Sequence, residues 1–417
     1  MKFPRIILTT GLCFIVFSAQ AAGRDPILER YIRLAVTQNP QIAVADRTAE
    51  AMQQEIPQVG TLPEPMLGFG IKDLSADDPA LSRTEMTGQY VMLEQMFPFP
   101  GTLGLRQNIA RHEYNIAKTD ATNARLMLTA EIAELYYRWA YIREAAELVR
   151  QNKSLMKQMA DLAATAYSVG MGAQSDILQA RTQVTKFDIE LADLKQKERS
   201  IIADINICCN LPPDATTTPP SPLVYEAIDV PYDSLWTRIT NDNPEAVAGR
   251  IKRDAADAKI KLAKKMYYPD FSFGVEYMQR GKAMPENMIS FNAGVSLPIF
   301  WSKKQDPMLK QRRIQRQAAA EAYQSTLNTL HFDLTDMTTM TASLREQIEN
   351  YRDIIIPQAE QTFESAQAGY TNGKVDFMTV LASQMTLLDA RRDFLMKTSE
   401  YLTTWAKIET MTARTLP

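Results

Sequence analysis

Histidine, cysteine and glycine are all scarce in this chain of 417 residues. There are 2 histidines and 3 cysteines, so sites that depend on imidazole or thiolate groups are poorly supplied. With 16 glycines and 22 prolines, collagen-like and glycine-rich repeats are excluded. The formal net charge of −3 provides no basic field for a nucleic acid backbone. We therefore predict no enzyme activity, no cofactor, no bound metal and no nucleic-acid partner.

The first 21 residues have the pattern of a secretory signal peptide. Lys2 and Arg5 precede a mostly apolar stretch at 6–17, and a small-x-small cleavage pattern ends at Ala21. The apolar stretch is shorter than the ~20 residues that a membrane-spanning helix needs. We expect cleavage after Ala21, which also removes Cys13. Because no cysteine follows near the predicted cut, a lipid anchor on cysteine is not expected.

The two remaining cysteines, Cys208 and Cys209, are neighbours in the sequence. Adjacent cysteines cannot join distant segments, so packing rather than disulfide bonds must hold the fold. Two interpretations stay open. They are either small, half-buried residues near a helix end, or a strained vicinal disulfide or metal-thiolate site.

Four landmarks recur in the same order at a nearly constant offset. Asn39-Pro40 returns 204 residues later as Asn243-Pro244, and Tyr167-x-x-Gly170 returns 203 residues later as Tyr370-x-x-Gly373. Motifs that begin at residues 65 and 97 return at 269 and 297. This spacing predicts a duplicated unit. The expected order is a signal peptide at 1–21, a first copy at 22–210, a proline-rich linker at 211–228 and a second copy at 229–417.

Each copy is predicted to contain a helix, a β-hairpin and a pair of long helices. No proline occurs from Gly101 to Val169, and at ~1.5 Å per residue such a helix spans on the order of 100 Å. Pro357 lies within the corresponding stretch of the second copy, where its missing N–H should interrupt the helix. The hairpins are expected at 63–99 and 269–300, and the helix pairs at 101–210 and 302–413.

Apolar residues of the first long helix follow a heptad rhythm. One stripe steps by four and three residues from Leu128 to Val149, and a second runs beside it from Ala130 to Ala140. Two adjoining stripes indicate that the helix packs on both flanks, as in a wall of helices. We therefore expect long antiparallel coiled-coil helices.

Apolar residues in the predicted strands alternate with polar or small ones. Strands of ~9–11 residues with one apolar face fit a wall that faces lipid. An amphipathic hairpin on a soluble core is the alternative. The side chains expected to face lipid are Phe271, Phe273, Val275, Tyr277, Ile289, Phe291 and Val295.

Two hairpins provide only four strands, which cannot close a barrel. An open sheet edge would leave unpaired N–H and C=O groups in hydrocarbon. If the strands enter a membrane, several chains must close the sheet together, with two copies giving eight strands and three giving twelve. The larger barrel is preferred for transport, because side chains fill the interior of about eight strands.

The whole mature chain resembles the TolC family of bacterial outer-membrane efflux channels. The resemblance rests on the duplicated layout, on the two Asn-Pro motifs, and on the two Tyr-x-x-Gly turns with Leu178 and Leu381 downstream. The segment from Glu94 to Gly101 (EQMFPFPG) is similar to the strand-to-helix corner of the heavy-metal efflux branch, which covers copper/silver and cobalt/zinc/cadmium exporters.

This resemblance implies a mainly α fold with a small transmembrane β part. Three copies would complete a twelve-stranded β-barrel in the outer membrane, continued by an α-barrel in the periplasm. The implied partners are two further copies, outer-membrane lipid, a periplasmic adaptor and an inner-membrane pump of the RND type. The implied cargo is metal ions or small toxic compounds. The helix tips that would contact the adaptor are Tyr167, Gly170, Met171, Gly172, Tyr370, Gly373, Lys374 and Asp376.

The sequence departs from the family at the expected aperture. Well-known members carry two aspartates after the second tip glycine, and the matching positions here are Thr379 and Ala382. Asp176 and Asp376 are the local candidates for a negative ring. A solvated carboxylate at a helix end is the alternative for each.

Two other functions stay open, a periplasmic structural or adaptor coiled coil and the outer-membrane exit duct of a protein secretion system. A secreted helical enzyme would need a catalytic cluster. The sequence has no glycine-rich phosphate loop, nucleophile elbow or Cys-x-x-Cys motif.

Overall fold

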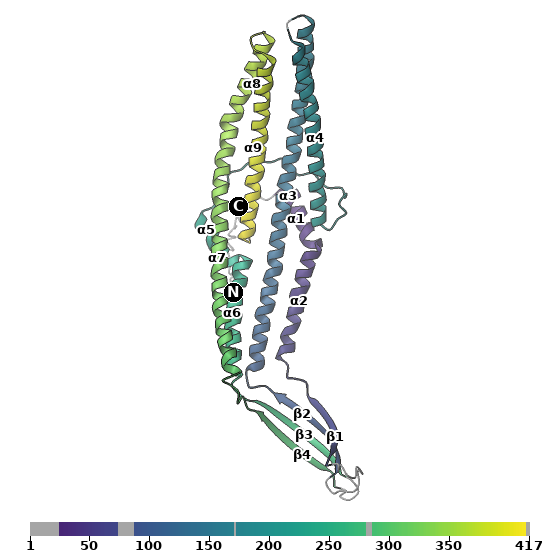
Figure 1. The fold of residues 1–417 in the computed structure, drawn as a ribbon, viewed down its shortest axis with the longest axis vertical. Helices are drawn as coiled ribbons and strands as arrows, with labels where there is room; N and C mark the ends of the chain where they lie inside the picture. Colours follow the sequence, from purple (N-terminus) through teal and green to yellow (C-terminus); the bar gives the residue numbers. More distant parts are fainter. Residues whose placement is uncertain (1–24, 74–86, 171, 281–285, 414–417) are drawn as a thin grey trace, which may run out of the picture.

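The computed structural model describes residues 25–73, 87–170, 172–280 and 286–413. The molecule is long and narrow, with two helical tips at one end, a wall of helices in the middle and a four-stranded sheet at the other end (Figure 1). The predicted signal peptide lies outside the described residues.

Each half begins with two helices, where the sequence led us to expect one. The first break falls at Asn39, which is extended with φ −67° and ψ 125° because a residue before proline avoids the helical conformation. Its side-chain oxygen accepts a hydrogen bond of 2.8 Å from the N–H of Gln41 and caps the next helix. Asn243 breaks the second half in the same way. The helices are α1 (Pro26–Gln38), α2 (Pro40–Gly60), α5 (Tyr232–Asp242) and α6 (Pro244–Lys265).

The same two asparagines also join distant helix ends. The amide nitrogen of Asn39 donates to the backbone oxygen of Cys208 at 2.9 Å, and that of Asn243 donates to Met411 at 3.0 Å. Both asparagines are buried. Each therefore connects the start of one helix to the C-terminal end of another.

The long helices form the tall part of the molecule. In the second half, α7 passes through a π-helical turn, η1 (Tyr351–Ile355), before α8 begins next to Pro357, so the predicted interruption is confirmed. Among the helices of the described residues, none is both long enough and apolar enough to span a membrane. The long helices are α3 (Thr102–Ser168), α4 (Gln174–Cys208), α7 (Gln305–Asn350), α8 (Ile356–Thr371) and α9 (Phe377–Met411).

The core is spread along the wall of helices as three clusters. The predicted heptad stripe of α3 is buried except for the partly buried Leu135, with Ile132 and Trp139 at its centre. A second cluster near the tips brings α3 and α4 together with α8 and α9, and includes Phe187 and Phe377. Cys208 and Cys209 are buried at the end of α4 as free thiols, which agrees with the first of the two interpretations above.

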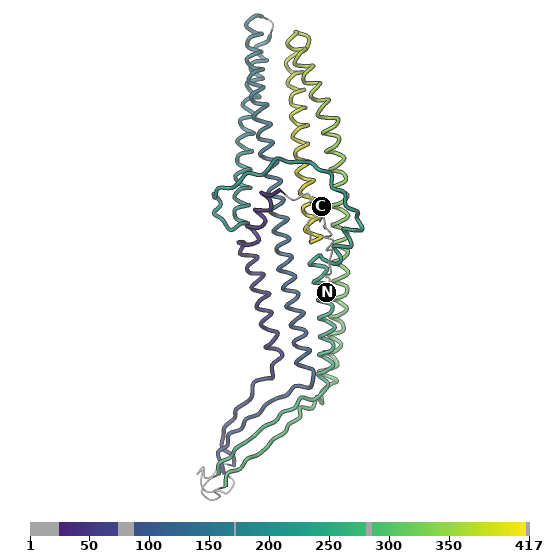
Figure 2. The backbone as a smooth tube through the Cα atoms, turned by 180° about the vertical axis from the view of Figure 1, so that it is seen from behind, coloured from purple at the N-terminus to yellow at the C-terminus, as the bar shows by residue number. Residues whose placement is uncertain are grey.

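Residues 211–231 cross the wall between α4 and α5 as an extended strap (Figure 2). The hydroxyl groups of three tyrosines form hydrogen bonds with backbone groups of the strap. Tyr31 donates to the oxygen of Thr218 at 2.8 Å, and the N–H of Ser221 donates to Tyr136 at 3.0 Å. The N–H of Ile228 donates to Tyr401 of α9 at 2.9 Å. The strap is therefore bonded to helices of both halves.

The sheet has the order β1-β2-β3-β4 and is antiparallel throughout. Its central pair, β2 with β3, joins the two halves in a register that runs from Gly88 opposite Arg280 to Phe97 opposite Phe271. Among the described strands, β1 and β4 are paired on one side only. The strands are β1 (Met66–Lys72), β2 (Gly88–Phe97), β3 (Asp270–Arg280) and β4 (Met288–Ser296).

Candidate functional site: the apolar sheet face and the helix tips

One face of the sheet is apolar across all four strands. Within one chain this face has no cover, as Phe69 is 83% exposed and Phe291 is 81% exposed. The strand register generates rows of neighbours on this face. One row is Phe69, Val91, Tyr277 and Ile289, and the next is Leu67, Leu93, Val275 and Phe291.

All seven side chains that we expected to face lipid lie on this apolar face, because the register places their strand positions on the same side. Six are exposed in the single chain, whereas Phe271 is half-buried. Phe273 packs edge-on against Phe97, with ring centroids 5.8 Å apart. Their contact with lipid stays a prediction.

The opposite face of the sheet carries polar and small side chains together with methionines, among them Met92 and Met278. Glu276 is only 4% exposed and forms an ion pair with Lys72, whose ammonium group also lies 5.0 Å from the ring centre of Tyr90. Ser290 and Asn292 of β4 continue this face. On β3, Glu276 and its neighbours on the polar side are buried while the residues of the apolar side from Phe273 to Tyr277 are exposed, the reverse of a sheet that packs on a soluble core.

The first tip joins α3 to α4 through a glycine turn. Gly170 has a φ of +78°, and its N–H donates to the oxygen of Tyr167 at 3.0 Å. A Cβ at this position would meet nothing within 4 Å, so the backbone conformation and not the space favours glycine. Gly172 differs, since a Cβ there would lie 3.1 Å from Ala166. Met171 lies outside the described residues.

The second tip joins α8 to α9 with a similar turn. Gly373 has a φ of +68° and donates to the oxygen of Tyr370 at 3.0 Å. The N–H of Lys374 donates to Gly369 at 2.8 Å, which closes the C-terminal end of α8. The side chain of Lys374 is exposed.

Asp376 acts as the N-cap of α9. Its carboxylate accepts hydrogen bonds from the backbone N–H of Thr379 at 2.8 Å and from the Thr379 hydroxyl at 2.5 Å. These bonds hold the pKa of Asp376 below its usual value. Thr379, where the resemblance led us to expect an aspartate, is therefore a capping partner here.

Asp176 is the candidate that contacts the other tip. Its carboxylate lies 3.4 Å from the hydroxyl of Tyr370, which is long for an O–H···O bond. Burial and the charge of Asp176 both raise the pKa of Tyr370. The Tyr370 ring also packs edge-on against the buried Phe377 at 5.7 Å between centroids. Tyr167, the counterpart of Tyr370 in the first tip, is instead 49% exposed.

A hollow of about 640 Å³ lies between the two tips. The first tip contributes Leu162, Ala166 and Asp176, and the second contributes Tyr370 and Val375. Sequence reasoning located the turns but missed Leu162 and Val375. An apolar residue close to each turn was the feature of the sequence that could have indicated them.

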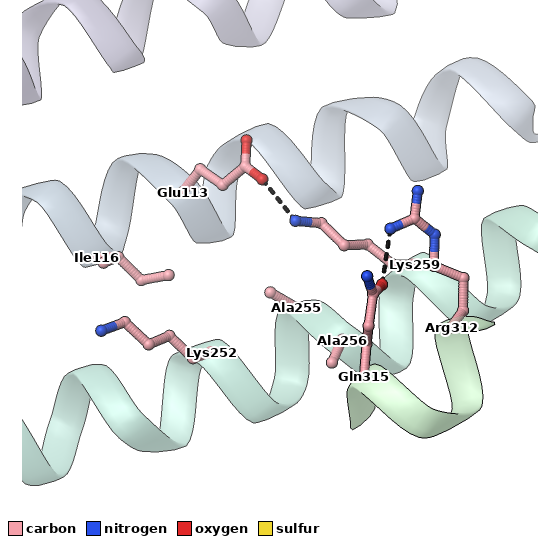
Figure 3. A pocket seen from close by; sticks show the side chains of 8 residues that line it. All are labelled: Glu113, Ile116, Lys252, Ala255, Ala256, Lys259, Arg312 and Gln315. Carbon is pink, nitrogen blue, oxygen red and sulfur yellow. Dashed lines mark hydrogen bonds and ion pairs between the residues drawn. The ribbon is translucent and has the colours of Figure 1, made fainter. Parts of the chain in front are cut away.

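A second hollow of about 360 Å³ lies where α3, α6 and α7 meet (Figure 3). Lys259 of α6 forms an ion pair of 2.8 Å with Glu113 of α3, and Arg312 of α7 donates to Gln315 at 2.8 Å. Lys252 extends along the same hollow. No cluster of three or more histidine, cysteine, aspartate or glutamate side chains that could hold a metal occurs within the described part of the chain.

The family described as "Outer membrane efflux protein" matches residues 31–202 and 236–414. The chain therefore belongs to the outer membrane efflux protein family, and its place is the outer membrane. The predicted resemblance and the predicted fold class, mainly helical with four strands, are confirmed.

Relatives of known description extend over nearly the whole chain. The chain is 24% identical over 395 residues to the "Cobalt-zinc-cadmium resistance protein CzcC" of Cupriavidus metallidurans, covering 93% of this chain and 90% of that protein. It is 23% identical over 396 residues to the "Probable efflux pump outer membrane protein TtgC" of Pseudomonas putida, covering 88% and 78%. The solved structure of the outer membrane protein VceC from Vibrio cholerae shares the fold, with a TM-score of 0.78, 19% identity, and coverage of 93% and 96%.

Proposed function

We propose that three copies of this chain form a passive channel through the outer membrane, continued by a helical tunnel in the periplasm. The observation that carries this proposal is the sheet, which has an exposed apolar face and two edges that are paired on one side only. Joining β4 of each chain to β1 of the next would pair every edge in a ring of twelve strands. That closure meets the requirement that no backbone group stays unpaired in hydrocarbon.

The polar face of the sheet would line the channel. Glu276, Lys72 and Asn292 would then meet water, while Phe69 and Phe291 would meet lipid. Three copies are favoured over two because a barrel of about eight strands is filled by its own side chains. Twelve strands leave room for a solute to pass.

The helix tips are the proposed contact with a periplasmic adaptor, which would connect the channel to an inner-membrane pump of the RND type. The hollow between the tips is lined by Gly170 and Gly373, the two turn glycines with positive φ. The contact between Asp176 and Tyr370 connects the two tips of one chain, in addition to the apolar cluster that they share. Opening of the channel would separate these groups, driven by the adaptor.

The proposed cargo is metal ions, with small toxic compounds as the broader class. The corner segment from Glu94 to Gly101 supports metal efflux, as does a relative whose name records resistance to cobalt, zinc and cadmium. Specificity would reside in the pump, because the channel is a passive conduit.

The channel proposal is tested by the mass and conductance of the purified protein. In detergent, light scattering should give a protein mass of three chains, and planar bilayers should record ion conductance. A single chain that stays soluble without detergent and conducts nothing would contradict the proposal.

The cargo is tested separately by deleting the gene and measuring growth on copper, silver, zinc, cobalt and cadmium. Lower tolerance that the wild-type gene restores is expected for at least one metal. Unchanged tolerance to all five metals would remove the metal assignment and leave the channel proposal standing.

A further inference from the structure

The corner between β4 and α7, residues 297–304, presents an aromatic and cationic surface. Leu297, Ile299, Phe300 and Trp301 are each more than half exposed in the chain. Lys303 and Lys304 follow after Ser302 and are exposed as well, and within the described part of the chain neither forms an ion pair. Large aromatic side chains next to unpaired ammonium groups are unusual on a surface that faces only water.

This surface is held by an ordered turn. The N–H groups of Lys303 and Lys304 both donate to the oxygen of Phe300 at 3.0 Å, and the N–H of Asp306 donates to Trp301 at 2.9 Å. Asp306 in turn accepts a hydrogen bond of 2.6 Å from the hydroxyl of Tyr267 at the end of α6. The backbone is therefore fixed in a shape that leaves Phe300 and Trp301 outside.

The corner continues the apolar face of the sheet. Val295 lies on the apolar face of β4, and the exposed Leu297 comes two residues later, directly beyond the end of the strand. The corner lies where the sheet meets the lower end of the helical wall, at the start of α7 (Figure 1). If the apolar face lies in hydrocarbon, this corner lies at the periplasmic boundary of the membrane, the level where tryptophan and lysine are enriched in membrane proteins.

The corresponding corner of the first half lacks this character. Residues 98–104 read PFPGTLG and contain no lysine, arginine or tryptophan. The fold therefore does not require lysines or a tryptophan within the corner segment itself. The first corner takes a cation from the last turn of α6 instead, because the ammonium group of Lys265 lies 4.9 Å from the ring centre of Phe99.

We propose that this corner is a binding site for the phosphate-bearing headgroups of anionic phospholipids in the periplasmic leaflet. Phe300 and Trp301 enter the interface beside the acyl chains, and Lys303 and Lys304 pair with lipid phosphate. The site would fix the height of the channel in the membrane. The inference rests on the outer-membrane location and on the closed sheet proposed above, and it does not depend on the cargo.

The experiment measures quenching of Trp301 fluorescence by brominated lipids around the purified trimer in vesicles. Brominated phosphatidylglycerol and brominated phosphatidylcholine are compared, each in a phosphatidylcholine background. The variant Trp301→Phe defines the signal of the other tryptophans, two of which, Trp139 and Trp405, are buried in the helical wall. We expect Trp301 to be quenched by both lipids, and the anionic lipid to be preferred several-fold.

The double variant Lys303→Gln/Lys304→Gln should keep the quenching but lower the preference for phosphatidylglycerol by about fivefold or more. The matched control Lys186→Gln/Lys195→Gln removes two exposed lysines of α4, far from the sheet, and should leave the preference unchanged. Each variant is first checked for trimer mass and conductance. Absence of these two properties from the wild type would refute the channel proposal and with it the lipid site, whereas a conducting trimer without lipid preference would refute the lipid site alone.

Two results would overturn the lipid site. If neither brominated lipid quenched Trp301 in a conducting trimer, a neighbouring copy would have to cover the corner. If the two brominated lipids quenched Trp301 equally in both the wild type and the double variant, the corner would contact the membrane without preferring anionic lipids.

Discussion

At the scale of single residues, the asparagine before each proline combines a helix cap with a contact between distant helix ends. Replacing Asn243 by alanine removes the cap of α6 and the bond to the oxygen of Met411. We expect a loss of about 1–2 kcal/mol in the free energy of unfolding, measured as a lower unfolding temperature of the solubilised protein. Asn243→Asp keeps the capping oxygen but loses the amide donor, so its stability should lie between that of the wild type and that of Asn243→Ala.

Asn241→Ala serves as the control for this change, because Asn241 is an exposed residue of α5. Its effect should stay within about 0.5 kcal/mol. If Asn243→Ala were as harmless as this control, the asparagine would not hold the helix ends together.

The thiols of Cys208 and Cys209 should not react with alkylating reagents in the folded protein. Burial raises the pKa of Cys208 to about 12 and that of Cys209 to about 11, so few thiolates exist at pH 8. We expect iodoacetamide at pH 8 to leave both unlabelled until the protein is denatured. The exposed control Ser200→Cys should react within minutes. Rapid labelling of the native protein would contradict the burial of these thiols.

The contact between Tyr370 and Asp176 should bias the tips toward the closed arrangement. Tyr370→Phe removes the hydroxyl and keeps the ring on Phe377. Because the bond is long, we expect a shift on the order of 1 kcal/mol, or about fivefold in the opening equilibrium, seen as a higher open probability in planar bilayers. Tyr167→Phe, on the exposed counterpart, should change nothing. Equal effects of the two variants would argue against a role in the aperture.

At the scale of elements, the glycine turns at the tips depend on backbone conformation. Gly373 has a positive φ and open space around it, so Gly373→Ala should cost about 1 kcal/mol from strain alone. We expect the amide of Lys374, which bonds to Gly369, to exchange about fivefold faster with solvent. Gly373→Asn should be milder, because asparagine tolerates this conformation.

Gly104→Ala provides a control of opposite sign. Gly104 lies within α3 in open space and without a positive φ, so alanine should stabilise that helix. If alanine destabilised both positions equally, the strain argument for the tip turn would fail.

The sequence was most informative where one element carries its own signal. The heptad stripe and the absence of proline predicted α3 almost to the residue, as Thr102–Ser168. The helix break at Asn39 was missed although its cause, an asparagine before proline, was visible. Pro357 predicted an interruption of the second long helix, but the π-helical turn before it, η1, was not predicted.

Contacts between elements that are distant in the chain could not be predicted from the sequence. Strand periodicity predicts each hairpin but not that β2 pairs with β3, which requires knowing that the two halves lie side by side. The contact between Asp176 and Tyr370 has the same origin. The capping role of Asp376, in contrast, could have been inferred from Thr379 three residues later.

At the scale of the whole molecule, a long helical wall ends in a sheet that one chain leaves incomplete. Its apolar face is exposed and its outer strands are paired on one side only. In water such a surface favours aggregation, whereas in a membrane it needs only neighbouring chains to close it. The same geometry therefore accounts for the outer-membrane location and for the proposed trimer.

The most direct test of this account is the thiol accessibility of neighbouring positions on one strand. Phe291→Cys and Asn292→Cys place a thiol on opposite faces of β4, and Phe273→Cys and Ser272→Cys do so on β3. In outer-membrane fragments, a water-soluble maleimide should label positions 292 and 272 rapidly, and positions 291 and 273 only after detergent is added. Rapid labelling of 291 and 273 in the intact membrane would place the apolar face in water and contradict the account.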